Sequence, residues 1–350
     1  MFTYLFFLSS GLFLGWSLGA NDASNIFGTA VGTKMLRFSF AAAIAGIFII
    51  LGSVLSGQNT ADTLNTLGSI NTLPAAFSVS LSSALAVFLM LKSGISVSIS
   101  QAIVGGIVGW NLYTGSQTNI ETLARICSSW IICPIIAGCI AVILYWIIKG
   151  ILGRCKIHLL WQDWVVRVGM ILTTALGGYA LGANNMANVV GVFIDSCKFS
   201  SFKIGNFYTL SGIQVLFLLG GIAACTGVFT YSQKTIKNVG RNLLSLSPMV
   251  AWIVILSQSL VLIMFSSNKI EQILLSLNLP TLPAVPVSST QAVIGAIIGI
   301  GIAKGGKGIK WGLVLKLMSG WVASPVIALV LSYISLSFME NVFRQPVILP

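Results

Sequence analysis

Long, uninterrupted apolar runs constrain this chain more than any other feature of its sequence. Ten such runs fall at about residues 2–20, 38–56, 75–91, 95–112, 123–148, 164–182, 204–230, 248–266, 284–303 and 312–338. A helix needs about 20 apolar residues to cross a bilayer, and these runs are continuous rather than alternating, which excludes the pattern of a β-barrel. The sequence therefore predicts an all-α integral membrane protein with about ten transmembrane helices, some of them broken or re-entrant.

The scarcity of charge excludes the soluble classes of protein. Only 7% of the residues are charged and 56% are apolar, whereas a soluble domain has roughly 25% charged residues. The net charge of +12 would suit a nucleic-acid partner, but the cations lie between the apolar runs. That placement follows the positive-inside rule instead, so we expect no nucleic acid.

The distribution of basic residues predicts the orientation. With the N-terminus outside and the crossings alternating, 14 of the 19 Lys and Arg residues fall in inside connections. This predicts a multi-pass protein of the cell membrane with both termini outside. Residues 1–18 have no basic n-region and no small-residue cleavage site, so we expect a retained first helix rather than a signal peptide.

The sequence also contains an internal repeat. Residues 19–28 read GANDASNIFG and return at 182–191 as GANNMANVVG. The segment SISQ at 98–101 returns as SSTQ at 288–291, and the Trp-x₃-Pro spacing of Trp130 and Pro134 returns 191 residues later. These pairs keep the same order in the chain, which indicates a duplicated unit.

The number of crossings per unit predicts how the two copies are arranged. Five crossings are odd, so the second copy must enter the membrane from the opposite side, as in the inverted repeats of many secondary transporters. We expect a first repeat at 1–149, a basic cytoplasmic linker at 150–163 and a second repeat at 164–350.

Two polar clusters end the first and sixth runs. The first contains a carboxylate, which costs roughly 2.5–3.5 kcal/mol at membrane depth and is rarely accidental. A helix broken there offers carbonyls, amide oxygens and a carboxylate, which suit Na⁺, or a proton on Asp22. The alternative is an interfacial capping cluster, and the recurrence of the motif counts against it. The clusters are Asn21, Asp22 and Asn25, and Asn184, Asn185 and Asn188.

Two hydroxyl-rich segments open glycine-containing apolar runs. Hydroxyls beside the unpaired N–H groups of a helix start form an anion site without any basic side chain. Simple N-capping is the alternative, and two copies in inverted halves favour a shared central site. The segments comprise Ser98, Ser100 and Gln101, and Ser288, Ser289, Thr290 and Gln291.

The sequence does not predict an enzyme. The only histidine, His158, lies in the linker, and no nucleophile, base and metal set can be assembled. The six cysteines form no C-x-x-C pair, so we expect no cofactor other than a coupling ion.

Together these motifs resemble the inorganic phosphate transporter family, the cation-coupled phosphate permeases. The resemblance rests on GANDASNIFGTAVG at 19–32, its echo at 182–191, the two hydroxyl segments and the Trp-x₃-Pro pair, in order along nearly the whole chain. It implies alternating access, phosphate held between two inverted halves, and symport with Na⁺ or H⁺. The implied partners are phosphate, the coupling cation and the bilayer, with a homo-oligomer left open.

The resemblance also implies roles for individual residues. Asn21 and Asn184 would join the hydroxyl segments in binding the anion. The coupling cation would use Asp22, Asn25, Asn185 and Asn188, with Asp22 as the Na⁺ ligand. Asp62 would be an accessory residue.

Two departures from the family pattern leave alternatives open. Asn185 stands where the second copy usually has Asp, and Lys234 stands where an acidic residue is usual. Sulfate has no P–OH-type donor and prefers a site made of donors alone, whereas phosphate benefits from an acceptor such as Asp22. Phosphate is therefore the expected substrate. The alternatives are a sulfate permease of the same superfamily and a non-transporting oxyanion receptor or regulator.

Overall fold

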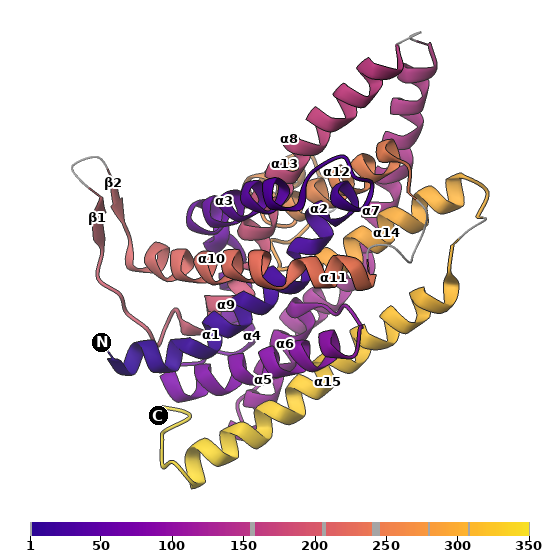
Figure 1. Cartoon of the computed structure of the whole chain (residues 1–350). Helices are drawn as coiled ribbons and strands as arrows, with labels where there is room; N and C mark the ends of the chain where they lie inside the picture. The colour runs from indigo at the N-terminus through magenta and orange to yellow at the C-terminus, as the bar shows by residue number, and fades with distance from the viewer. Residues whose placement is uncertain are drawn as a thin grey trace.

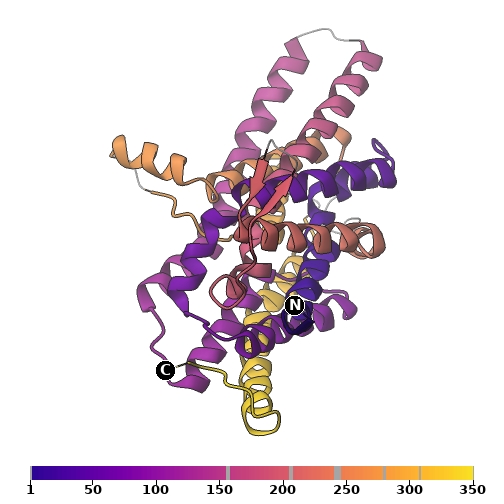
Figure 2. The same ribbon diagram turned by 90° about the vertical axis from the view of Figure 1, so that its left-hand side faces the viewer.

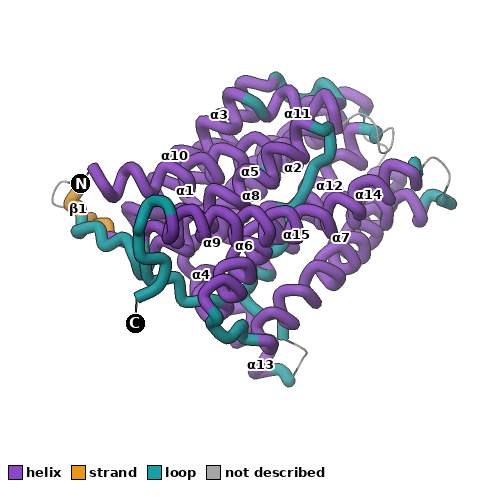
Figure 3. Tube along the Cα trace, turned by 90° about the horizontal axis from the view of Figure 1, so that it is seen from below, coloured by secondary structure: helices purple, strands orange, loops and turns teal. Residues whose placement is uncertain are grey.

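The chain folds into a bundle of helices, shown in Figure 1. The structure is a computed structural model that describes residues 2–154, 158–204, 208–239, 246–278, 281–306 and 309–349. Within these ranges the β structure is one short antiparallel hairpin of β1 (Phe202–Ile204) and β2 (Tyr208–Leu210), and Figure 3 shows how completely helix dominates the rest.

The helices follow the apolar runs of the sequence closely. The first part of the chain contains α1 (Phe2–Asn21), α2 (Ala23–Gly32), α3 (Phe38–Ser56), the 3₁₀ helix η1 (Gly57–Thr60), α4 (Ala61–Leu67), α5 (Leu73–Lys92), α6 (Ile99–Thr114) and α7 (Ile120–Arg154). The second part contains α8 (Leu159–Asn185), α9 (Ala187–Val190), the 3₁₀ helix η2 (Gly191–Phe193), α10 (Gly212–Thr230), α11 (Ser232–Val239), α12 (Pro248–Met264), α13 (Asn268–Ser276), α14 (Ser289–Ala303) and α15 (Trp311–Asn341).

The lengths of the helices confirm an all-α membrane protein with broken segments. Among the described residues, seven helical segments are long and apolar enough to cross a bilayer, and α12 with α13, bent by 76°, makes up to eight. Helices α6 and α14 have 16 and 15 residues, which is less than the roughly 20 that a full crossing needs. Pro283 and Pro286 help to explain the late start of α14, because proline disfavours helical geometry in the residue before it.

Helices from the two parts of the chain pack against each other in equivalent pairs. Helix α1 packs on α10 and α8 packs on α3, while α6 packs on α15 and α14 packs on α7. Gly105 of α6 touches the carbonyl of Pro325, and Gly295 of α14 touches the carbonyl of Pro134. A Cβ at either glycine would collide with backbone, so these close crossings require glycine.

The chain ends lie at one end of the bundle. Both termini are near the β1–β2 hairpin, and the junction of α14 with α15 lies at the opposite end (Figure 1). Figure 2 shows α7 and α8 projecting beyond the other helices. Helical residues enter the predicted 150–163 linker from both sides, and residues 155–157 of that linker lie outside the described residues.

Candidate functional site

The two Asn-rich motifs lie at breaks in long helices. Helix α1 ends at Asn21 and α2 begins at Ala23, with Asp22 in the turn between them. Helix α8 ends at Asn185, and α9 begins two residues later. Asp22 is only 1% exposed, so its carboxylate is held inside an apolar bundle, where an ionisable group is expensive and usually functional.

The Asp22 carboxylate has polar neighbours from both halves of the chain. Its Oδ1 accepts a hydrogen bond from Asn21 Nδ2 at 2.7 Å and another from Thr290 Oγ1 at 3.4 Å. Ser289 and Asn185 also lie beside it. The ion pairs among the described residues are Glu121–Arg125 and Asp163–Arg167, so within this part of the chain no basic side chain neutralises Asp22.

The two hydroxyl segments cap the starts of the short helices. Ser98 Oγ accepts from the backbone N–H of Gln101 at 3.3 Å, and Ser288 Oγ accepts from that of Gln291 at 3.2 Å. The alternative of N-capping is therefore correct for these two serines. The first two amides of each helix have no intrahelical acceptor, however, and the positive end of each helix dipole lies there.

Each Asn cluster is hydrogen-bonded to the hydroxyl segment of the other half. Asn25 Nδ2 donates to Thr290 Oγ1 at 3.0 Å, and Asn188 Nδ2 donates to Ser100 Oγ at 3.0 Å. Ser100 Oγ in turn donates to the carbonyl of Val287 at 3.1 Å. The structure thus brings together residues that lie up to 268 positions apart, as Asp22 and Thr290 do.

Asn21 and Asn184 hold the extended segments that precede the short helices. Asn21 Nδ2 donates to the carbonyl of Val97 at 2.6 Å, while its Oδ1 accepts from Ser96 Oγ at 2.7 Å. Asn184 Nδ2 donates to the carbonyl of Val285 at 3.1 Å, and its Oδ1 accepts from the N–H of Val287 at 2.8 Å. Both amides are thus engaged by the protein, and their direct contact with the anion stays a prediction.

These extended segments were not recognised as part of the site from the sequence. The carbonyls of Val97, Val285 and Val287 accept hydrogen bonds from the Asn clusters and the hydroxyl segments, and carbonyls at the broken ends of α1 and α8 accept hydrogen bonds as well. Pro283 and Pro286 carried the signal for one of the extended segments, because each proline disfavours helical geometry in the residue before it. No comparable signal marks residues 95–97.

Several buried polar atoms near these clusters have no hydrogen-bond partner among the described residues. They are the side-chain oxygens of Gln101, Gln291 and Asn188, and both polar atoms of Asn185. Buried polar atoms normally pair, so unpaired ones indicate a missing ligand, ion or water. Side-chain amide oxygens, like carboxylate oxygens, are ligands that a hard cation takes.

Asp62 does not join this buried group. Its side chain is exposed on α4, where it lines two surface cavities of about 370 and 580 Å³. Lys234 is also exposed, with its Nζ 5.2 Å from the centre of the Tyr231 ring. Neither charge therefore acts directly on Asp22.

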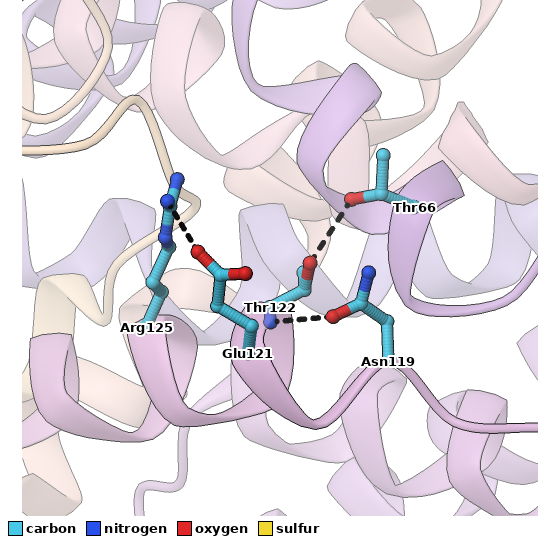
Figure 4. A network of polar contacts seen from close by, with 5 residues as sticks. All are labelled: Thr66, Asn119, Glu121, Thr122 and Arg125. Carbon is cyan, nitrogen blue, oxygen red and sulfur yellow. Dashed lines mark hydrogen bonds and ion pairs between the residues drawn. The ribbon is translucent and has the colours of Figure 1, made fainter.

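The larger cavity reaches from the surface toward the buried clusters. Figure 4 shows part of its wall, where Glu121 pairs with Arg125 at 2.7 Å, Asn119 caps the start of α7 and Thr66 lies 3.5 Å from Thr122. Val285, whose carbonyl binds Asn184, also lines this cavity. The cavity is therefore a candidate entrance.

The helix breaks, the crossed contacts and the buried carboxylate define a multi-pass membrane transport protein. The chain belongs to the phosphate transporter family, whose model matches residues 18–271 and 272–348. This places it among transporters rather than enzymes, as its sequence predicts.

Individual relatives are similar over nearly their full lengths. A candidate phosphate permease of Methanocaldococcus jannaschii is 28% identical over 322 residues, covering 92% of this chain and 93% of the relative. A candidate phosphate permease of Thermococcus kodakarensis is 24% identical and covers 93% and 95% of the two chains. A solved structure of a sodium-dependent phosphate transporter has the same fold, with a TM-score of 0.77, 19% identity, and coverage of 98% of this chain and 100% of the other.

Proposed function

We propose that this protein imports inorganic phosphate by symport with Na⁺ through alternating access. The observation that carries the proposal is the crossed pair of contacts from Asn25 to Thr290 and from Asn188 to Ser100. These contacts join two helix breaks and two half-helix starts at one buried place, the arrangement in which secondary transporters hold substrate and coupling ion.

Coupling to a cation follows from the charge of the substrate. Each negative charge moved inward against 100 mV costs about 2.3 kcal/mol, so a phosphate dianion costs about 4.6 kcal/mol before any concentration gradient. An uncoupled carrier would release phosphate rather than accumulate it. A cation bound together with the anion removes part of this cost.

The anion site lies at the starts of α6 and α14. Unpaired first-turn amides, the hydroxyls of Ser100, Ser289 and Thr290, and the two helix dipoles offer donors and positive potential to an oxyanion. Asp22 Oδ1 lies 3.4 Å from Thr290 Oγ1 and would accept the P–OH proton that phosphate has and sulfate lacks. This single acceptor favours phosphate over the sulfate alternative.

The cation site is built around Asp22. The unpartnered oxygens of Gln101, Gln291 and Asn188 would complete an all-oxygen shell with the Asp22 carboxylate, which suits Na⁺. A proton would need only the carboxylate and would leave those oxygens without a ligand. The name of the solved neighbour, a sodium-dependent phosphate transporter, supports the same choice.

The arrangement of the two halves also belongs to this proposal. Residues 1–149 and 164–350 would be inverted repeats joined by a cytoplasmic connection, with both termini outside. The equivalent packing of α1 on α10 and α8 on α3, and of α6 on α15 and α14 on α7, supports this. In that orientation the cavity beside Asp62 is the external entrance.

Uptake of labelled phosphate into proteoliposomes tests the proposal. An inward Na⁺ gradient should drive accumulation, and an equal excess of unlabelled sulfate should compete weakly. Accumulation driven by a pH gradient alone would reject Na⁺ coupling, and stronger competition by sulfate would assign the sulfate alternative. Phosphate binding without flux would identify a receptor.

A further inference from the structure

An apolar groove runs between α7 and α14, outside the site described above. It has a volume of about 720 Å³ and includes Pro134, Ile135, Val142 and Ile143 from α7 and Ile298 and Ile302 from α14. Gly138, Gly295 and Gly299 lie along its base, where the two backbones touch. Most of the neighbouring α7 side chains are exposed or half-buried, and only 28% of its apolar window is buried.

The length of the groove matches one leaflet of a bilayer. The wall on α7 runs from Pro134 to Trp146, which are twelve helical steps apart, or about 18 Å of helix. Half of the hydrocarbon thickness of a bilayer is about 15 Å. The groove is therefore long enough for an acyl chain of one leaflet.

Two lysines lie at the same end of the groove, beside Tyr145 and Trp146. Lys149 Nζ lies 4.9 Å from the ring of Trp146 and 5.6 Å from the ring of Tyr145, and Lys304 Nζ lies 5.5 Å from the same Tyr145 ring. Both lysines are exposed, and the ion pairs of the described residues, formed by Glu121 and Asp163, include neither of them.

The equivalent place in the other half has the opposite charge. The repeat offset of 191 brings Lys149 to Glu340, which accepts a hydrogen bond from Tyr113 at 2.6 Å. The repeat offset of 190 brings Lys304 to Thr114. The basic pair is thus specific to one face of the membrane, the face that the distribution of Lys and Arg predicts to be cytoplasmic.

We propose that this groove binds one acyl chain of an anionic phospholipid, with the headgroup phosphate between Lys149 and Lys304. The apolar walls suit the chain, the aromatic rings lie at the depth where aromatic residues collect, and the two uncompensated lysines complement the phosphate. A neutral lipid would fill the groove without using the lysines. The site is independent of the substrate site around Asp22.

Native mass spectrometry of the purified protein tests this proposal. Titration with phosphatidylglycerol should give a saturable bound lipid at lower concentration than phosphatidylcholine with the same chains. The double variant Lys149→Ala/Lys304→Ala should bind phosphatidylglycerol roughly 30-fold more weakly, about fivefold for each lysine. The control Lys316→Ala removes another exposed lysine, on α15, and should bind as the wild type does.

A second variant tests the groove itself. Val142→Trp should occupy the groove and abolish the saturable site while leaving both lysines in place. Equal binding of the two lipids by the wild type, or an unchanged preference in the double variant, would overturn the proposal. So would saturable phosphatidylglycerol binding that persists in Val142→Trp, or a lipid-free dimer that Val142→Trp dissociates, which would assign the groove to a second copy.

Discussion

Asn25 donates a hydrogen bond to Thr290 Oγ1 over 3.0 Å, across 265 residues of sequence. Its counterpart in the second half, Asn188, donates a hydrogen bond to Ser100 Oγ of the first half, also over 3.0 Å. Each helix break is therefore tied to a half-helix start from the opposite half. Movement of one half-helix would displace the helix break to which it is hydrogen-bonded. These hydrogen bonds therefore provide a physical route that couples cation and anion occupancy.

Removing the Thr290 hydroxyl should weaken phosphate binding. In Thr290→Val the buried Asn25 amide loses its shorter hydrogen bond and keeps only the one to Ser289 Oγ at 3.3 Å, and the loss of one hydrogen bond costs about 0.5–1.5 kcal/mol. We expect the KM for phosphate to rise about tenfold, as measured by initial uptake rates in proteoliposomes. Thr226→Val is the control, because that hydroxyl is exposed and donates only within α10. Equal KM values for the two variants would remove Thr290 from the site.

Neutralising Asp22 should abolish driven uptake. Asp22→Asn keeps the shape of the side chain but removes the carboxylate from a site where no basic residue of the described chain opposes it. We expect phosphate accumulation under a Na⁺ gradient to fall to background. The matched variant Asp62→Asn changes an exposed carboxylate at the entrance and should retain most of the uptake. Normal accumulation by Asp22→Asn would exclude Asp22 as the cation ligand.

Adding one methyl group at either of the two close glycine crossings should destabilise the protein. A Cβ at Gly105 or Gly295 would meet a backbone carbonyl of the facing helix, and neither backbone can move without repacking. We expect Gly105→Ala and Gly295→Ala each to cost about 1–3 kcal/mol, seen as a lower Tm in detergent. Gly150→Ala, where a Cβ meets nothing within 4 Å, should not lower the Tm and should raise it slightly, because alanine favours the helix more than glycine does. Comparable Tm values for all three variants would mean that the crossings are not tightly packed.

A second carboxylate beside Asp22 should make stability depend on Na⁺. Asn185 is fully buried, and Asn185→Asp would place two like charges in one site, which disfavours both being ionised. We expect a Tm several degrees below the wild type without Na⁺ and a recovery on adding Na⁺ in place of K⁺. Asn185→Ala is the control for loss of the amide. An equal rise in Tm on adding Na⁺ in both variants would show that the added carboxylate does not interact with the cation.

The sequence predicted the elements better than it predicted the contacts. Apolar runs of about 20 residues set the helices because a bilayer demands them, and the repeated GAN motif identified both helix breaks. Whether Asp62 is buried or exposed could not be predicted, because the local sequence around a single acidic residue does not show whether its side chain faces the core or a surface cavity.

The contacts of Asn21 and Asn184 could not be predicted from the sequence either. Their residue type announced a polar site, but their partners are backbone groups at Val97 and Val285, many residues away in the chain. Only the folded arrangement decides whether an amide binds a ligand or holds the segment that does. The hydroxyls of Ser100 and Thr290 do lie against the Asn clusters, and their contact with the anion stays a prediction.

The most direct test of the central claim is a structure of the protein determined with phosphate and Na⁺ present. We expect tetrahedral density within hydrogen-bond distance of the starts of α6 and α14, between Ser100 and Thr290, and a second, smaller density on Asp22. Phosphate density confined to the surface cavity beside Asp62, with nothing between the two half-helices, would contradict it.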